Sequence, residues 1–350
     1  MPLLAEDDFW GAAAHAFDGE ALELTILPTE RCNLNCVYCY ETFQLGKMKS
    51  EVVRSVTRLI ARRGPHLRRL AIDWFGGEPL LAMDVIEEIA SAAQAAAGDN
   101  PHLDYSSSAT TNGVLLTADR ARKLAALGVR TLHVSLDGPA EAHDETRVNK
   151  KGEGTFAGLH DNLVAIRDSD IDVRIKLRVH VTQRNHQLLR GFTDELIETF
   201  VPDKRFDIYY FPIVDLGGPK QGELKVLSNQ EANAVITRLS EQLAAARERL
   251  GVYPDKEPNK WSCKSAYVCY AAKANAWVIR SNGRLAKCTV GFEDERNDVG
   301  RLTPGGEFEL QEDRLPVWMR GWESRDKLSL HCPYEGLRND VAIGQVEGRA

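Results

Sequence analysis

Short hydrophobic runs alternate with longer amphipathic stretches between residues 20 and 212. The runs are rich in Val, Ile, Leu, Phe and Tyr, as is typical of buried parallel strands. They predict strands over Leu22–Leu27, Leu70–Phe75, Leu103–Thr110, Thr131–Leu136, Val173–Val181 and Arg205–Pro212. The stretches between them repeat apolar residues at helical spacing. They predict helices over Ser50–Arg63, Asp84–Ala97, Thr117–Leu127, Thr155–Arg167 and His186–Phe200.

Strands that alternate with helices form a parallel sheet with right-handed crossovers. Six such units are fewer than the eight of a closed barrel. We therefore expect an α/β fold with a partial (β/α)6, TIM-like barrel, followed by a small C-terminal domain. Breaks in composition predict an N-terminal extension over 1–20, the barrel over 21–216, a bridging helical region over 217–260 and the C-terminal domain over 261–350.

Chemically special residues follow four of the predicted strands. Their loops are Cys32–Cys39, Gly76–Pro79, Thr111–Gly113 and Asp137–Pro139. Gly, Pro, Asn and Asp are ordinary turn formers, which would explain each loop alone. Because the carboxyl ends of parallel strands share one rim, the four loops together favour a binding site there.

The overall composition narrows the class of protein. The chain has 350 residues and a net charge of −7. No apolar run approaches the roughly 20 residues of a membrane helix, and the N-terminus lacks the pattern of an export signal. An acidic chain also lacks the basic face that nucleic-acid binding usually needs. We expect a cytoplasmic protein with neither nucleic acid nor a membrane as partner.

Cysteines fall into two groups separated by more than half of the chain. The seven are Cys32, Cys36, Cys39, Cys263, Cys269, Cys288 and Cys332. An odd count without an export signal argues against a disulfide framework. Cysteines that serve only as small hydrophobic residues scatter along a sequence, so two groups suggest two metal sites.

The first group has the spacing C-x3-C-x2-C over Cys32, Cys36 and Cys39. Three thiolates this close can hold one face of a [4Fe–4S] cluster, whose fourth iron then stays open to a substrate or cofactor. Zinc is the alternative, but structural zinc prefers four ligands. The sequence contains no fourth Cys or His close to these three.

This loop resembles the signature of the radical S-adenosylmethionine (SAM) enzymes, which place an aromatic residue before the last cysteine. Tyr38 occupies that position here. The resemblance implies that SAM binds the open iron of the cluster. Reductive cleavage of SAM would then give a 5′-deoxyadenosyl radical, which removes hydrogen from unactivated C–H bonds. A protein reductant such as flavodoxin or ferredoxin would supply the electron.

Further matches to this family lie in the other loops. Gly76, Gly77 and Glu78 belong to a segment that looks like the family's GGEP loop. The resemblance implies that the glycines let the backbone approach the SAM methionine amine, and that Glu78 adds an acceptor for it.

Two other matching residues point to the SAM carboxylate and one to the ribose. Ser135 and Arg147 occupy positions that hold the carboxylate in relatives, and Asn112 matches a polar residue near the ribose. Bidentate geometry suits arginine to a carboxylate. The alternative for Arg147 is a surface ion pair with Asp144 or Glu145.

The second cysteine group resembles the opening of SPASM and twitch domains, which are C-terminal extensions of peptide-modifying radical SAM enzymes. The match is Cys269-x13-Gly283-x4-Cys288, read as a hairpin turned at Asn282-Gly283. With Cys263 and Cys332, four thiolates could hold one auxiliary [4Fe–4S] cluster. Four thiolates also fit zinc.

Two departures from the full SPASM pattern limit the assignment. Leu328, Trp322 and Met319 stand where further cysteines would bind an outer cluster, so we expect that cluster to be absent and its place filled by apolar residues. Thr289 stands where sulfatase maturases carry an aspartate base. We identify no catalytic base. Histidines such as His143 and His180 lack metal-ligand spacing, and we expect them to be packed or solvent-facing.

The resemblance therefore predicts a radical SAM peptide or protein maturase. An oxidative cross-link in a ribosomal precursor peptide, through a C–C bond, a C–O bond or a thioether, suits an auxiliary cluster best. The short N-terminal stretch leaves no room for a leader-binding domain, so we expect leader recognition by a separate leader-binding protein or by the barrel and the C-terminal tail. The alternatives are formylglycine formation in the manner of sulfatase maturases, and a non-catalytic zinc scaffold.

Overall fold

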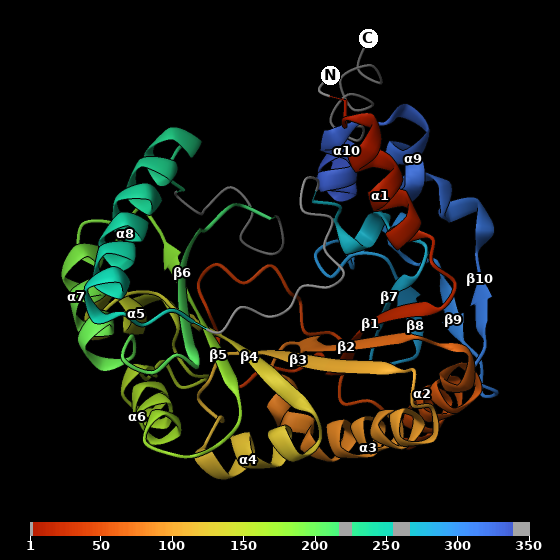
Figure 1. Cartoon of the computed structure of the whole chain (residues 1–350), viewed down its shortest axis with the longest axis horizontal. Helices are drawn as coiled ribbons and strands as arrows, with labels where there is room; N and C mark the ends of the chain where they lie inside the picture. Colours follow the sequence, from red (N-terminus) through yellow and green to blue (C-terminus); the bar gives the residue numbers. More distant parts are fainter. Residues whose placement is uncertain (1–2, 217–225, 255–266, 339–350) are drawn as a thin grey trace.

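The computed structural model contains one ten-stranded sheet and describes residues 3–216, 226–254 and 267–338. Six strands run parallel in chain order and curve into an open barrel (Figure 1). They are β1 (Ala21–Thr29), β2 (Arg69–Gly76), β3 (Asp104–Thr111), β4 (Val129–Leu136), β5 (Arg174–Val181) and β6 (Phe206–Pro212). The sheet does not close, so the expected partial barrel is confirmed.

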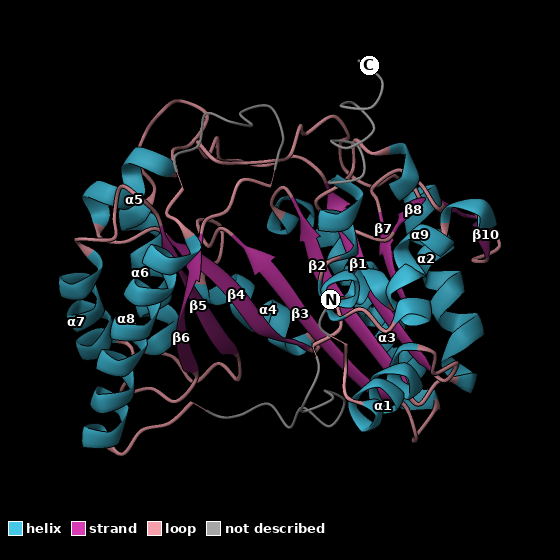
Figure 2. Ribbon diagram, turned by 90° about the horizontal axis from the view of Figure 1, so that it is seen from above, coloured by secondary structure: helices cyan, strands magenta, loops and turns pink. Residues whose placement is uncertain are grey.

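The long helices follow the strands and cover the outer side of the sheet, as Figure 2 shows from above. They are α2 (Ser50–Arg63), α3 (Met83–Asp99), α4 (Ala118–Ala126), α6 (Phe156–Arg167), α7 (Leu189–Thr199) and α8 (Asn229–Leu250). A short helix, α5 (Ala140–Thr146), follows β4 and was not predicted. Single turns of 3-10 helix occur at Gly64–His66, Pro79–Ala82, Tyr270–Ala272, Glu295–Asn297 and Glu312–Arg314.

The C-terminal part extends the barrel sheet at its β1 edge. Its strands are β7 (Ala276–Ile279), β8 (Arg284–Ala286), β9 (Gly300–Leu302) and β10 (Phe308–Leu310). β7 pairs with β1 in parallel and with β8 as an antiparallel hairpin. Gly283 turns this hairpin with φ +81°, in the region that favours glycine. One continuous sheet runs through the predicted barrel and the predicted C-terminal domain, so the sheet does not separate them. The domain boundaries remain predictions.

The N-terminal helix α1 (Glu6–Ala16) packs against the C-terminal helices α9 (Pro316–Ser324) and α10 (Lys327–His331), as Figure 1 shows. The ring of Trp322 lies 5.7 Å from Phe9 and 5.3 Å from Phe17. Leu328 is 62% exposed. The expectation that apolar residues fill a lost cluster site is therefore wrong for Leu328, and Trp322 packs mainly against the N-terminal segment.

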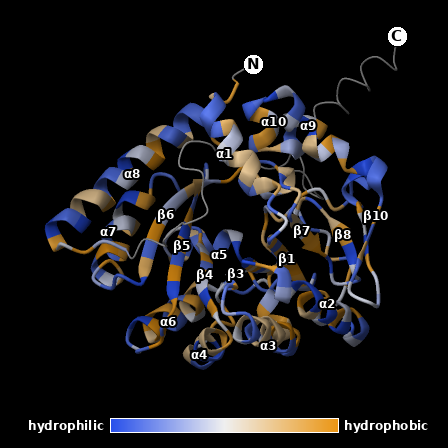
Figure 3. Cartoon of the chain, turned by 45° about the vertical axis from the view of Figure 1, so that its right-hand side comes forward, coloured by the Kyte–Doolittle hydropathy of each residue, from blue (hydrophilic) through white to orange (hydrophobic). Residues whose placement is uncertain are grey.

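Alternation along β4 and β5 gives the barrel a polar inner face. On β5, the buried residues Ile175, Leu177, Val179 and Val181 alternate with Arg174, Lys176, Arg178 and His180, a pattern visible in Figure 3. Period-two alternation places the second set on the opposite face of the sheet. The apolar set belongs to the main hydrophobic core. Within the described ranges, no helix combines the length and apolar character needed to cross a bilayer.

Candidate active site

The three N-terminal cysteines lie in the loop between β1 and α2, at the carboxyl end of β1. Backbone hydrogen bonds fix this loop: Asn35 N–H donates to the Val148 carbonyl at 2.8 Å and Val37 N–H to the Thr146 carbonyl at 3.0 Å. The amide of Cys39 donates to the carbonyl of Cys36 at 3.3 Å. The three thiols form no disulfide and are only partly exposed.

Burial shapes the acidity of these thiols. It raises the pKa of Cys32 to about 11 and that of Cys39 to about 12, and the charge of Cys36 adds to both shifts. Thiolates in this place therefore need a compensating positive charge, which iron would provide, so the donor set fits a cluster. Each ligand of a cubic cluster binds a different iron. Among the described residues, no three His, Cys, Asp or Glu side chains converge to hold a single ion.

The two glycines after β2 permit a close approach to the cysteine loop. A Cβ on Gly76, whose φ is +118°, would lie 2.2 Å from the Thr29 carbonyl oxygen. A Cβ on Gly77 would lie 2.5 Å from the Arg31 carbonyl oxygen. Both distances are impossible for a real Cβ, so this segment requires glycine for packing against the β1 loop. Their predicted contact with SAM stays a prediction.

Glu78 is fully buried and joins two loops of the rim. Its carboxylate accepts hydrogen bonds from Leu80 N at 3.0 Å, Thr111 Oγ1 at 2.8 Å and Asn112 N at 2.8 Å. Burial raises its pKa, although these donors oppose the shift. With three protein donors in place, Glu78 anchors the rim, and its role toward the methionine amine stays a prediction. The side-chain amide of Asn112 in turn donates to Asn33 Oδ1 at 2.8 Å, beside Cys32.

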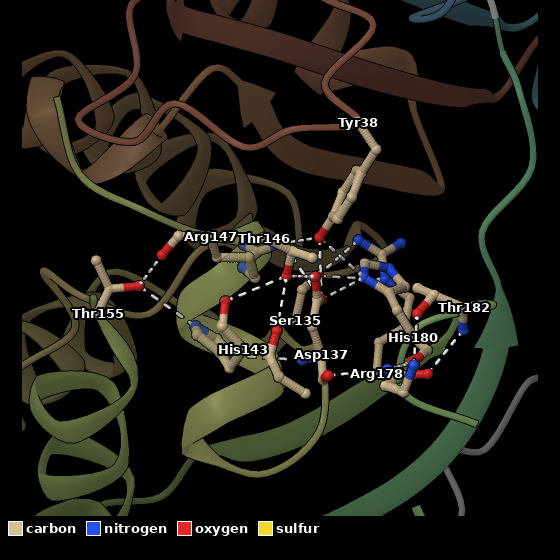
Figure 4. Close-up of polar contacts among 12 residues, drawn as sticks. Tyr38, Ser135, Asp137, His143, Thr146, Arg147, Thr155, Arg178, His180 and Thr182 are labelled. Carbon is tan, nitrogen blue, oxygen red and sulfur yellow. Dashed lines mark hydrogen bonds and ion pairs between the residues drawn. The ribbon is translucent and has the colours of Figure 1, made fainter. Parts of the chain in front are cut away.

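Arg147 lies inside the barrel mouth and is only 6% exposed. Its Nη1 donates to the Tyr38 hydroxyl at 2.7 Å (Figure 4). Its Nε is buried without a hydrogen-bond partner in the described part of the chain. The alternative of a surface ion pair is therefore wrong: Asp144 instead accepts from the amides of Thr155 and Phe156. A buried guanidinium with an unused N–H fits an incoming carboxylate.

Ser135 lies on β4 opposite Arg178 on β5. Arg178 donates to the Ser135 hydroxyl oxygen from Nη2 at 2.9 Å and Nε at 3.3 Å. The Ser135 hydroxyl thus acts as an acceptor toward Arg178 and keeps its own proton for another partner.

Asp137 and His180 also belong to the site, although the sequence pointed only to the loop of Asp137 and gave neither side chain a role. Asp137 is 1% exposed, and one carboxylate oxygen lies 2.9 Å from both the Tyr38 hydroxyl and His180 Nδ1. Burial alone would raise its pKa, but the hydrogen bond from His180 and the charge of Arg147 hold it well below the usual range. His143 also reaches this group, since its Nδ1 accepts from the Asp137 amide at 3.4 Å. His180 is packed, as expected, at 6% exposed, and it also takes part in the hydrogen bonds around Asp137.

The second cysteine group gathers beside the β7–β8 hairpin. The charges of Cys288 and Cys332 both act on Cys269, whose pKa burial raises to about 12. Cys263 lies outside the described residues. The hydroxyl of Thr289 hydrogen bonds to Tyr270 at 2.9 Å and lies close to Tyr40 of the first cysteine loop. Tyr40 interacts electrostatically with both Cys39 and Cys288, so the two cysteine groups approach each other at this residue.

A polar cavity of about 430 Å³ opens next to the cysteine loop. It is lined by Gln44 and Leu45 of that loop, by the hairpin, by residues 292–295, 297 and 298, and by Arg314. Its three arginines are engaged: Arg280 pairs with Glu30, Arg284 with Asp298, and Arg314 donates to backbone carbonyls. Four acidic residues share the lining: Glu293, Asp294, Glu295 and Asp298.

Fold and site together define an iron–sulfur enzyme built on a partial barrel with its rim loops around three cysteines. The family model described as the radical SAM superfamily matches residues 26–201, and the chain belongs to this superfamily. It is therefore an enzyme that uses a [4Fe–4S] cluster and SAM. The alternative of a non-catalytic zinc scaffold is wrong.

Both curated proteins and solved structures resemble this chain. A GTP 3′,8-cyclase of Mycobacterium sp. (strain KMS) is 34% identical over 305 residues, which cover 85% of this chain and 83% of that protein. The structure of anSMEcpe with AdoMet and the Kp18Cys peptide is 18% identical with a TM-score of 0.67, and covers 85% of this chain and 84% of that one. Streptococcus suis SuiB bound to the precursor peptide SuiA is 16% identical with a TM-score of 0.57, over 89% and 68%. The two structures show a shared fold.

Proposed function

We propose that this chain is a cytoplasmic radical SAM enzyme that modifies a peptide, and that its product is an oxidative intramolecular cross-link in a ribosomally made precursor peptide. The bond would be a C–C bond, a C–O bond or a thioether. The carrying observation is the gathering of Cys269, Cys288 and Cys332 beside the hairpin, next to the first cysteine loop.

Two redox sites suit a cross-link because the reaction removes two hydrogens from the peptide. When bound, the cluster and SAM abstract one of them from an unactivated carbon. The second leaves the substrate as a proton and an electron, so an electron acceptor must lie near the barrel. An auxiliary [4Fe–4S] cluster on Cys263, Cys269, Cys288 and Cys332 would be that acceptor.

The chain's own residues hold and orient the cofactors in this proposal. Cys32, Cys36 and Cys39 bind iron. Arg147 and Ser135 hold the SAM carboxylate, because the buried Nε of Arg147 and the free proton of Ser135 both remain available for an acceptor.

The remaining assignments concern the other end of SAM and the proteins that act with the enzyme. In this proposal Asn112, whose side-chain amide donates to Asn33 beside Cys32, contacts the ribose, and the backbone of Gly76 and Gly77 approaches the amine. The partners would be a flavodoxin or ferredoxin and a separate leader-binding protein.

Formylglycine formation is the less favoured peptide reaction. Thr289 has no carboxylate, and its hydroxyl is already hydrogen-bonded to Tyr270. Glu293 lines the polar cavity and accepts a hydrogen bond from Thr42 at 2.9 Å. No step of the proposed cross-linking reaction requires this carboxylate.

A reaction on a nucleotide is the second candidate, favoured by the 34% identity to a GTP 3′,8-cyclase. A triphosphate site needs several cationic groups free to contact phosphate. In the polar cavity each arginine already has a partner and the acidic residues outnumber the arginines. Mixed charges of this kind suit a peptide better.

One parallel assay separates the two candidates. The protein, purified and reconstituted without oxygen, is incubated with SAM, dithionite and either GTP or synthetic peptides encoded beside its gene. We expect 5′-deoxyadenosine together with loss of two hydrogens from one peptide, measured by mass spectrometry, and unchanged GTP. The Cys36→Ser variant should produce neither. Consumption of GTP with every peptide unchanged would overturn the peptide proposal.

A further inference from the structure

Four polar side chains from four segments meet inside the barrel where β4 ends (Figure 4). Asp137 directly follows β4, and His180 comes from β5. Tyr38 comes from the cysteine loop and Arg147 from the residue after α5. The side chains of Asp137, His180 and Arg147 are each more than nine-tenths buried, and Tyr38 is partly buried. Such a cluster is costly unless each hydrogen bond is satisfied.

We propose that His180 and Asp137 are positioning residues that fix Arg147 through the hydroxyl of Tyr38, and so set the orientation in which the guanidinium receives the SAM carboxylate. The inference rests on membership in the radical SAM superfamily and does not depend on the peptide substrate.

The hydrogen bonds define a direction through the cluster. Thr146 Oγ1 donates to one oxygen of Asp137 at 2.7 Å, and His180 Nδ1 donates to the other at 2.9 Å. This second oxygen also accepts the single proton of the Tyr38 hydroxyl at 2.9 Å. The hydroxyl oxygen of Tyr38 then has lone pairs left, and it accepts from Arg147 Nη1 at 2.7 Å.

Arg147 is held at Nη1 by the Tyr38 hydroxyl, whereas its Nε has no hydrogen-bond partner among the described residues. Its Nη1 also lies 3.9 Å from Asp137, close enough for attraction but too far for a direct hydrogen bond. The Nε has no partner in the described structure. A buried N–H without an acceptor is destabilising, and a ligand carboxylate would satisfy it. Tyr38 therefore fixes which N–H groups remain for the ligand.

Strand geometry explains why His180 serves this purpose. Asp137 lies two residues beyond Ser135, directly after the end of β4, and His180 lies two residues beyond Arg178 on the neighbouring strand β5. Ser135 pairs in register with Arg178. The positions two residues further along both segments therefore bring His180 next to Asp137 on the same face of the sheet. The Asn185 amide donates to the backbone carbonyls of Asp137 and His180 at 2.8 Å each, which locks the two strand ends together.

The experiment measures the SAM dissociation constant by anaerobic titration calorimetry on iron-loaded protein, with iron content and the electron paramagnetic resonance spectrum as controls for the cluster. For both Tyr38→Phe and His180→Leu we expect affinity to fall by about ten-fold or more. His180→Asn places an amide where Nδ1 stood and should stay within about three-fold of wild type. Tyr210→Phe is the matched control, because it removes a buried hydroxyl bonded to Thr193 at 2.6 Å, on the neighbouring strand β6.

A double variant tests the route of the effect. If His180 acts through Tyr38, then Tyr38→Phe with His180→Leu should bind SAM no more weakly than Tyr38→Phe alone. Additive losses, or unchanged affinity in iron-loaded Tyr38→Phe, would overturn the proposal. Should His180→Leu fail to fold, Tyr38→Phe and the rescue by His180→Asn still decide the question. A failure of the peptide assay would leave these affinities unchanged, so the two proposals fail separately.

Discussion

Single residues at this site are constrained by neighbours on other strands as much as by any ligand. Glu78 accepts three protein hydrogen bonds while lying at the centre of the rim. Gly76 has its positive φ because the chain must turn against Thr29. Residues of this kind hold the site in shape before any cofactor is bound. The protein therefore loses less conformational entropy when the cofactor binds.

Replacing Gly76 with alanine should disrupt the rim. The new Cβ would meet the Thr29 carbonyl at 2.2 Å in a backbone conformation that alanine rarely adopts. We expect the free energy of unfolding to fall by at least about 2 kcal/mol, with weaker SAM binding. Gly98→Ala in α3 is the control: its Cβ meets nothing within 4 Å, so stability should stay within about 1 kcal/mol of wild type. Urea unfolding measures both, and equal stability of the two variants would contradict this account.

Some residues of the site can be predicted from the sequence alone, and others only from the pairing of the strands. Spacing and resemblance pointed to the cysteine loop, to Glu78, Ser135 and Arg147, and the structure brings these together at one rim. The roles of Asp137 and His180 were not predicted because they depend on the pairing of β4 with β5, which one sequence does not reveal. The sequence did contain one signal for these residues: polar side chains recur at a spacing of two, at Ser135 and Asp137 and again at Arg178 and His180.

Elements were predictable in proportion to their length. All six barrel strands and five long helices have hydrophobic patterns that identify them. The strands β9 and β10 have only three residues each and α5 has seven, too few for a period to emerge. The helix α1 escaped prediction because its apolar side faces α9 and α10, more than 300 residues away in the chain.

A charged cluster on β1 joins three distant elements and should make stability depend on pH. Lys273 donates to the two oxygens of Glu23 at 3.1 and 2.9 Å, and His15 and Arg69 lie within 3.4 Å. Burial raises the pKa of Glu23, but these partners outweigh it and lower the pKa from 4.5 to about 2. The carboxylate therefore stabilises the fold fully above pH 4.5, and the contribution, at most about 3 kcal/mol, is lost as pH falls towards 2.

Glu23→Gln isolates this contribution. Its deficit in unfolding free energy against wild type should be largest at neutral pH and shrink between pH 4.5 and pH 2, as measured by urea unfolding across that range. Glu20→Gln is the control, since Glu20 pairs with Arg68 at the surface, where both side chains are more than half exposed. A deficit that is constant with pH would show that Glu23 acts by packing alone.

At the scale of the whole molecule, the two cysteine groups come from opposite ends of the sequence and meet across the β1 edge of the barrel. The pairing of β7 with β1 carries the hairpin there, and Tyr40 and Thr289 connect the two loops. The described thiols in both groups form no disulfide and are at least partly buried. Two separate clusters are therefore expected to load independently.

Paired cysteine variants test this independence. Each cubic cluster holds four irons, so Cys288→Ser should lower the iron content by about half while the remaining cluster still changes its paramagnetic spectrum when SAM is added. Cys36→Ser should lose a similar amount of iron, but its remaining cluster should not respond to SAM, because all of its irons have protein ligands. Stoichiometric zinc in Cys36→Ser, or a SAM response that survives in it, would contradict the assignment of the two groups. The contrast between equal iron loss and unequal SAM response follows only if the open iron belongs to the loop after β1.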